Sequence, residues 1–306
     1  MIEKVEQGNI TIEEFHHILQ GFRNKKSKDL FLKLKDFLLN SKDTFFPPAQ
    51  EGQEKRRSEE IVNALFSLAS NKPKNFGVYR VVVRDQIDEV IASYQEDIYE
   101  ALKTGDGELV TRVAQFMYLF KTTEFENIWW RIENRVHELL EQEGALDIYN
   151  LTNIVRSFSR SQDNIMAGSD KLLVHMEPLI MANMDKIESQ DLPHLLYGYS
   201  VRKAGNPELY EAFNKRLHAM IDEGEMWDYQ FLFNLNYYLM FSDNVDKRIW
   251  EHLVESTLYQ DDVLPMYFYK AFKYSRFYLE HHFPEWDVSE YIDRFYFAER
   301  YFNQSQ

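Results

Sequence analysis

The chain has no cysteine and little glycine or proline: its 306 residues include 11 Gly and 8 Pro. The absence of cysteine excludes disulfide bonds, thiol nucleophiles and thiolate metal ligands. The small number of turn-forming residues argues against an all-β fold, which needs many tight turns. No apolar run approaches the roughly 20 residues that a helix needs to cross a bilayer. These absences leave a helical protein without thiol chemistry as the simplest expectation.

The sequence signatures of common enzymes are also missing. There is no GxxxxGKS/T or GxGxxG pattern to bind phosphate, and no GxSxG or HExxH. Glu280, His281 and Glu285 would meet a cation only if the chain turned at Pro284, and a solvated loop is the simpler interpretation. We therefore predict no catalytic, cofactor-binding or metal-binding residues and no enzymatic activity.

The formal net charge of -15 is unevenly distributed along the chain. Residues 1–92 carry 15 Lys and Arg against 14 Asp and Glu, a net of +1, so residues 93–306 carry -16. Such an acidic surface disfavours nucleic acid and anionic lipid, because binding to phosphates depends on Lys and Arg. The first residues, MIEKVEQGNITIEEF, lack an apolar core, so we expect neither a secretory signal nor a transit peptide in this chain.

Apolar residues recur at spacings of three and four through most of the chain, as at Phe15, Ile18, Leu19 and Phe22. This spacing is typical of amphipathic helices. Strand-like alternation is rare, and the best strand candidate is VYRVVVRDQI at 78–87. Its Val residues favour a sheet, but its Arg and Asp residues fit one face of a helix equally well. The pattern predicts an all-α fold.

Two stretches, LTNIVRSFS at 151–159 and LPHLLYGYS at 192–200, share one pattern. Looser copies place the last apolar position at 22, 68, 117, 158, 199, 238 and 272, with steps of 34 to 49 residues. A second amphipathic stretch follows each copy. Because a single short helix cannot bury its apolar face alone, we predict an α-solenoid of about seven helix pairs with a period near 40 residues, forming one domain over 1–306.

Local signals refine this prediction. Thr11, Ser58 and Ser189 are suited to begin helices as N-caps. Within the shared pattern, Phe158 and Tyr199 are expected to fill the layer between neighbouring pairs. Residues 44–60, TFFPPAQEGQEKRRSEE, are the predicted flexible loop, because adjacent prolines cannot continue a helix and the charged residues after them need solvent.

The chain is rich in aromatic residues, with 23 Phe, 19 Tyr and 5 Trp that concentrate toward the C-terminus. Tyr, Trp and Phe are enriched at protein interfaces, and a bulky core with a hydrophobic C-terminal cap is the equally weighted alternative. A third use is base stacking, because Lys270, Lys273 and Arg276 are interleaved with tyrosines. The residues predicted for a protein interface are Tyr267, Tyr269, Tyr274, Tyr278, Phe295, Tyr296, Tyr301 and Phe302.

The pattern of an apolar helix ending in GF, SF or GY, a polar turn and a second helix resembles organellar helical-repeat proteins of the FAST-kinase-type and octotricopeptide-like group. LPHLLYGYSVRKAGNPELYEAFNKRLHAMI carries the resemblance most clearly. The resemblance implies a helical array in mitochondria or plastids and a link to RNA metabolism. No region of the chain resembles the RAP domain that often ends such proteins.

Together these observations predict a non-enzymatic helical-repeat scaffold or structural subunit of a larger protein complex. The resemblance implies a mitochondrial assembly, such as a respiratory complex, ATP synthase or the mitochondrial ribosome, with the cytoplasm as the alternative location. Other proteins of that assembly are the expected partners, without a membrane span. The alternative function is an organellar RNA-binding protein that contacts RNA through Lys270, Lys273 and Arg276.

Overall fold

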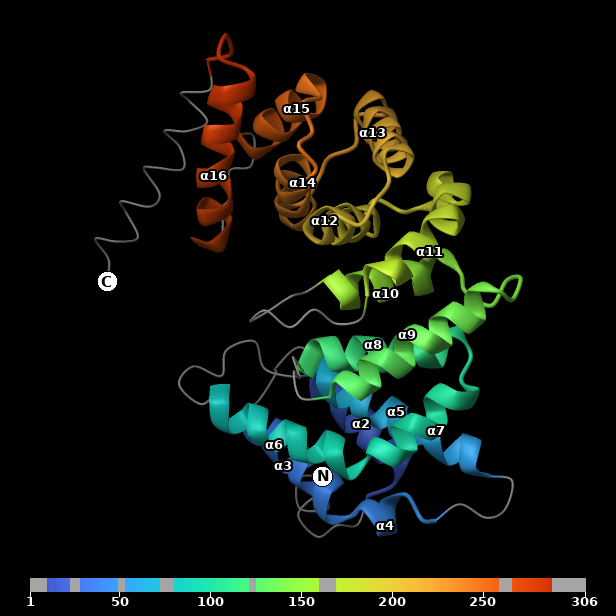
Figure 1. Cartoon of the computed structure of the whole chain (residues 1–306). Coiled ribbons are helices and arrows are strands. Elements are labelled where there is room, and N and C mark those ends of the chain that lie inside the picture. The colour runs from blue at the N-terminus through green and yellow to red at the C-terminus, as the bar shows by residue number, and fades with distance from the viewer. Residues whose placement is uncertain are drawn as a thin grey trace. The chain divides into compact units, whose positions relative to one another are not determined.

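The computed structural model describes residues 10–22, 28–48, 53–71, 80–120, 125–159, 169–258 and 266–287 (Figure 1). These residues form fifteen α-helices and one 3-10 helix, and none of them lies in a β-strand. The predicted all-α fold is thus confirmed. The strand candidate at 78–87 is helical from Arg80 onward. Contacts within the chain gather into two compact units, residues 1–172 and 173–306, and each is described by itself.

In the first unit, two sets of helices pack side by side. Helices α2, α5, α8 and α10 form one row, in which each contacts the next. Helices α7 and α9 contact each other, and α3 contacts α6. The bounds are α2 Ile12–Phe22, α3 Lys28–Asn40, α4 Lys42–Phe45, α5 Glu54–Ser70, α6 Arg80–Ser93, α7 Gln95–Thr104, α8 Gly107–Phe120, α9 Glu126–Leu140 and α10 Ile148–Ser159.

The second unit repeats this alternation. Helix α14 contacts both α12 and α16, while α13 contacts α15 (Figure 1). Trp250, Tyr199, Tyr238 and Phe213 are its largest fully buried side chains. The bounds are α11 Asp170–Ala182, which begins before the unit boundary, η2 Met184–Lys186, α12 Leu192–Arg202, α13 Pro207–Asp222, α14 Tyr229–Phe241, α15 Lys247–Leu258 and α16 Met266–His282.

The side chains that begin the helices agree only in part with the predicted N-caps. Thr11 and Glu14 form the expected capping box, in which each side chain accepts a hydrogen bond from the other residue's backbone amide. Ser58 is instead buried inside α5, and the Ser189 hydroxyl donates to Glu225 at 2.6 Å. Both of these predictions were wrong, because a Ser before acidic residues also suits a helix interior or a loop.

The segment predicted as a loop, 44–60, is helical at both ends. Helix α4 ends at Phe45, and α5 begins at Glu54. The charged run extends α5 because Arg56 pairs with Glu60 one turn later. Arg57 also donates to the carbonyls of Phe46 and Pro47, at 3.3 and 3.1 Å, and pairs with buried Asp97. Among the described residues of this segment, only Phe46, Pro47, Pro48 and Gln53 lie outside a helix.

The positions of the helices show why successive copies of the repeat pattern are unevenly spaced along the sequence. Helix α7 follows α6 after the single residue Tyr94, and it was not predicted. Tyr94 is fully buried, and its hydroxyl donates to the Leu38 carbonyl at 2.7 Å. Phe158 and Tyr199 are fully buried, as expected from the shared pattern. The pattern thus identifies core positions, and the extra helix accounts for the 49-residue step.

Candidate functional site

The second unit carries a cluster of aromatic rings on three neighbouring helices, which we call the aromatic face: Tyr197, Phe233, Tyr237, Phe241 and Tyr274. Tyr237 lies at its centre. Its ring centroid is 5.6 Å from that of Tyr197 on α12, and 4.9 and 5.5 Å from those of Phe233 and Phe241 on α14. Tyr274 on α16 lies close enough to help raise the pKa of Tyr237, after burial, which is the larger cause.

The rings remain partly open to solvent, although Tyr237 packs on three of the others. Phe241 is 43% exposed and Tyr274 is 66% exposed. Tyr197, Phe233 and Tyr237 are half-buried. One turn beyond Tyr274, Phe277 is also exposed. Packing in a buried core would not leave neighbouring aromatic rings exposed to solvent.

Two of the three helices beneath these rings, α12 and α14, are almost without charge. Helix α14, YQFLFNLNYYLMF, contains no charged residue. In α12, LPHLLYGYSVR, the one formally charged residue is Arg202, and it is buried. A surface helix in a soluble protein ordinarily carries charged residues on its outer side. The part of the aromatic face on α12 and α14 is therefore uncharged, whereas α16 carries Lys270, Lys273, Arg276 and Glu280.

The residues predicted from the sequence for an interface have different environments. Tyr274 belongs to the aromatic face. Tyr278 does not, because it is half-buried, its ring stacks on Trp250 and its hydroxyl donates to Asp243 at 3.2 Å. The side chains of Tyr267 and Tyr269 in α16, and residues Phe295, Tyr296, Tyr301 and Phe302, lie outside the described part of the chain. Their role in an interface stays a prediction.

Of the three residues proposed for nucleic-acid contact, the structure describes the side chain of Arg276 alone. Arg276 donates from Nε to Glu280 at 2.7 Å, so a carboxylate already balances its charge. The side chains of Lys270 and Lys273 lie outside the described residues. Tyr197, Phe233, Tyr237 and Phe241 were missed by sequence reasoning. Their signal was the spacing of four along 233, 237 and 241, which places three rings on one side of a helix.

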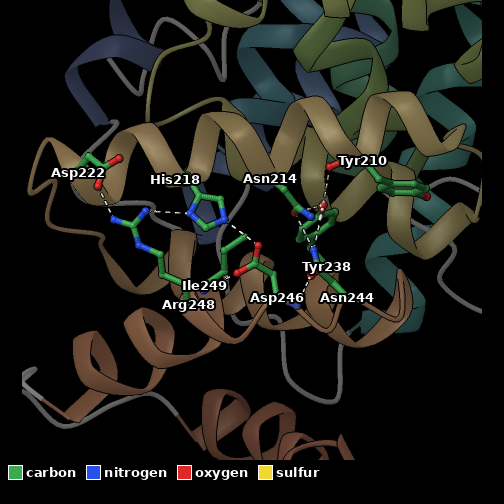
Figure 2. Close-up of polar contacts among 9 residues, drawn as sticks. All are labelled: Tyr210, Asn214, His218, Asp222, Tyr238, Asn244, Asp246, Arg248 and Ile249. Atoms are coloured by element: carbon green, nitrogen blue, oxygen red, sulfur yellow. Dashed lines mark hydrogen bonds and ion pairs between the residues drawn. The ribbon is translucent and has the colours of Figure 1, made fainter. Parts of the chain in front are cut away.

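A polar network lies in the same unit, along the side of α13 that faces α15 (Figure 2). His218 is at its centre: Nε2 is 2.7 Å from Asp246 Oδ2, and Nδ1 is 3.1 Å from Arg248 Nη1. Because a guanidinium only donates, Nδ1 accepts and Nε2 carries the hydrogen that is donated to Asp246. Arg248 also donates to Asp222, and this hydrogen bond lowers the pKa of that exposed carboxyl.

The second half of the network organises the turn between α14 and α15 (Figure 2). The Asn214 side-chain oxygen accepts from the Tyr238 hydroxyl at 2.8 Å and from Asn244 Nδ2 at 2.7 Å. Asp246 Oδ1 caps α15 by accepting from the Ile249 amide at 3.3 Å. The network thus fixes α13, the turn and α15 to one another. Both nitrogens of His218 are engaged in this bridging.

The fixed turn also positions the aromatic face. Asp243 lies in it with a left-handed backbone, φ 53°, and its carboxylate accepts from Tyr278 on α16. Ser275 of α16 donates to buried Asn236 of α14 at a second point. These two contacts hold α16 beside α14, and so they hold Tyr274 near Tyr237.

A buried carboxyl group, that of Glu177 in α11, is the most unusual polar group of this unit. It is 2% exposed, and neither of its oxygens has a hydrogen-bond partner among the described residues. Burial raises the pKa of Glu177, and nearby Glu208 raises it further. The backbone of Asn206 lies close enough to lower this pKa by a smaller amount, although it forms no hydrogen bond with the Glu177 carboxyl group. Folding therefore favours the neutral form of this carboxyl group.

Two further findings concern the described residues alone. No group of three or more His, Asp and Glu side chains among them is placed to hold a metal ion. None of the helices in the described segments is long and apolar enough to cross a membrane.

Comparisons with known proteins gave no relative. Neither a scan against models of protein families nor a search of curated protein sequences matched this chain. The functional proposal consequently depends on the geometry of the aromatic face.

Proposed function

We propose that this protein is a non-enzymatic α-solenoid of about seven helix pairs, with a period near 40 residues, that binds another protein as a scaffold or structural subunit of a larger complex. The alternating contacts within each unit support this architecture: α5, α8 and α10 pack in succession, as do α12, α14 and α16. Stacked helix pairs of this kind provide extended surfaces for binding.

The observation that carries the proposal is the aromatic face centred on Tyr237. Tyr237 contacts the rings of Tyr197, Phe233 and Phe241, yet Phe241 remains 43% exposed, and nearby Tyr274 is 66% exposed. Energetically important interface residues are enriched in large aromatics that cluster near the centre of the contact. Tyrosine suits this use because its ring is apolar and its hydroxyl can form a hydrogen bond with a group on either side of the interface. A partner that covers the face would remove these rings from water.

Affinity purification with mass spectrometry from the native cell tests this proposal. We expect the wild-type chain to retain specific proteins that are lost with Tyr237→Ser and with Phe241→Ser. Tyr149→Ser is the matched control, because Tyr149 is similarly exposed at 53% but lies on α10 in the other unit. Equal recovery of all partners by the wild type and the face variants would show that the face is not the binding surface.

The same experiment addresses location. The resemblance in LPHLLYGYSVRKAGNPELYEAFNKRLHAMI supports a mitochondrial assembly, and the retained proteins would name the compartment. Partners drawn from the cytosol alone would contradict this location without affecting the aromatic face.

RNA binding is the second candidate, and one observation in the first unit favours it. Arg112 and Gln115 lie one turn apart on α8 and are half-buried, and Gln115 donates to buried Asn153 of α10 at 2.6 Å. Arg and Gln side chains can contact phosphate or base edges. Glu108 already balances the Arg112 charge, which weakens this reading. Filter binding to single-stranded RNA at physiological salt separates the candidates, because tight, salt-sensitive binding would replace the scaffold proposal.

A further inference from the structure

A surface turn lies against the buried carboxyl group of Glu177. The turn, residues 203–206, joins α12 to α13, and the backbone of its last residue, Asn206, lies close enough to Glu177 to affect its pKa. Lys203, Asn206 and Glu208 are exposed, whereas Glu177 itself is buried. A small movement of this turn would therefore bring the carboxyl group into contact with water.

The closed turn leaves this carboxyl group without compensation. Both oxygens of Glu177 are buried, and neither has a hydrogen-bond partner among the described residues. An ionised carboxyl group that is buried without a partner is far more costly than a neutral one. The charge of Glu208, which lies nearby on α13, has the same sign and adds to the cost. The closed turn is therefore compatible with a neutral Glu177 and is destabilised by an ionised one.

Two tyrosines that interact with Glu177 do not change this balance. The Tyr199 hydroxyl donates to the Leu173 carbonyl at 2.8 Å, and the Tyr210 hydroxyl donates to the Tyr199 carbonyl at 3.1 Å. Because a hydroxyl has one hydrogen to donate, neither stabilises a Glu177 carboxylate in this arrangement. Burial raises the pKa of both tyrosines, so they stay neutral while carboxyl groups titrate. The charge that changes here between acidic and neutral pH is therefore that of a carboxyl group.

We propose that Glu177 is a pH-sensitive latch: while its carboxyl group is neutral the turn at 203–206 stays closed, and when the group ionises the turn opens and admits water to the carboxylate. The direction follows from burial, which raises the pKa of Glu177 in the closed form. Closure is fully stable below the ordinary glutamate pKa of about 4.3 and weakens as the pH rises through the raised value. No residue of the aromatic face takes part, so this inference is independent of the proposed function.

The amides of Ala204, Leu209 and Tyr210 report whether the turn is closed. Ala204 donates to the Tyr199 carbonyl at 3.2 Å, Leu209 to the Asn206 side chain at 2.8 Å and Tyr210 to the Asn206 carbonyl at 3.3 Å. An amide exchanges its hydrogen with solvent only when such a bond opens. Exchange through a local opening barely responds to urea, whereas exchange through global unfolding rises with urea.

Hydrogen exchange of the full chain, measured by NMR between pH 5 and pH 8 at several low urea concentrations, tests the latch. Each rate is divided by the intrinsic rate at that pH, which gives the opening equilibrium. We expect the opening equilibrium at Ala204, Leu209 and Tyr210 to increase at least about tenfold over this range, with little response to urea. The amides of α14 should exchange more slowly and respond to urea.

Three variants assign the effect to Glu177. Glu177→Gln stays neutral, so its opening equilibrium should not change with pH. Any dependence on pH that comes from His175 or His194, on α11 and α12, would persist in this variant. Glu208→Gln should open less with rising pH than the wild type, because a like charge near Glu177 is removed. Glu211→Gln, at an exposed position on α13, is the matched control and should behave as the wild type.

Three outcomes would overturn the latch. The first is an opening equilibrium that does not change with pH in the wild type, and the second is a change with pH that persists in Glu177→Gln. The third is exchange of the turn amides with the same urea dependence as α14, because the opening would then be global unfolding. If Glu177→Gln did not fold, an identical response to pH in the wild type and Glu208→Gln would overturn the inference instead.

Discussion

The ring of Tyr278 stacks on the ring of Trp250, with centroids 5.2 Å apart and planes 26° from parallel. Trp250 is fully buried in α15, and its indole Nε1 donates to the Asn244 carbonyl at 2.8 Å. Tyr278 therefore joins α16 to α15, whereas Tyr274, one turn earlier, faces solvent. Two tyrosines that look alike in the sequence have different roles.

Tyr278→Ala should destabilise the second unit by about 2–3 kcal/mol, because a stacked ring and a hydrogen bond are lost together. Tyr278→Phe should cost only about 1 kcal/mol, since the stacking remains. Urea unfolding followed by tryptophan fluorescence measures both. Tyr274→Ala is the control and should stay within about 0.5 kcal/mol of the wild type. Equal losses for Tyr274→Ala and Tyr278→Ala would contradict the assignment.

Glu177→Gln should stabilise the protein at neutral and alkaline pH. Burial raises the pKa of Glu177 in the folded state. Below the unfolded-state pKa of about 4.3 the group is neutral in both states, so the wild type loses no stability there. The free energy of unfolding then falls as the pH rises through the folded-state pKa. Glutamine stays neutral, so the variant should match the wild type in acid and exceed it above that range.

Urea unfolding between pH 4 and pH 9 measures this difference. Glu211→Gln is the matched control, because Glu211 is exposed on α13. A stability difference between wild type and Glu177→Gln that does not change with pH would show that the carboxyl is solvated in solution.

Gly107→Ala should destabilise the first unit by about 1–3 kcal/mol through overpacking. A Cβ atom at Gly107 would lie 2.3 Å from the Ala145 carbonyl oxygen and 2.9 Å from the Leu146 side chain. Thermal unfolding measures the effect, with Glu143→Ala, at an exposed position in the turn between α9 and α10, as the control. An unchanged melting temperature for Gly107→Ala would mean that the turn before α10 shifts freely.

Asp246→Ala should cost about 1–2 kcal/mol, because it removes the cap of α15 and the acceptor of His218. Asp246→Asn should retain most of the stability, since its amide oxygen can cap the helix equally well. Chemical denaturation distinguishes the two variants. Similar losses for Ala and Asn would indicate that the charge of Asp246, rather than its hydrogen bonds, holds the turn.

The sequence predicted the helices well because their apolar spacing is local. It missed the boundary between α6 and α7, where no Gly or Pro separates the helices and the chain bends at Tyr94. The reason lies 56 residues away, at the Leu38 carbonyl that the Tyr94 hydroxyl contacts. His218 and Asp246 likewise meet across 28 residues. Local patterns do not contain such pairings.

The candidate surface was predicted only in part for a related reason. Aromatic density in α16 pointed to Tyr274 and Tyr278 alike, and only the packed structure separates them through Trp250. The row on α14 was visible as a spacing of four, but the same spacing also describes core residues. Exposure, which distinguishes the two cases, depends on which helices pack above α14.

Tyr237 and Tyr238 are consecutive residues with opposite surroundings: Tyr237 belongs to the aromatic face, whereas Tyr238 is fully buried and bonded to Asn214. Natural selection would therefore act on these neighbours independently. Among descendants of this chain, position 238 should change only together with position 214, and as slowly as other core positions. Under the proposed function, position 237 should change together with the sequence of the protein that binds the face, so this dipeptide would record the history of the fold and that of the proposed complex separately.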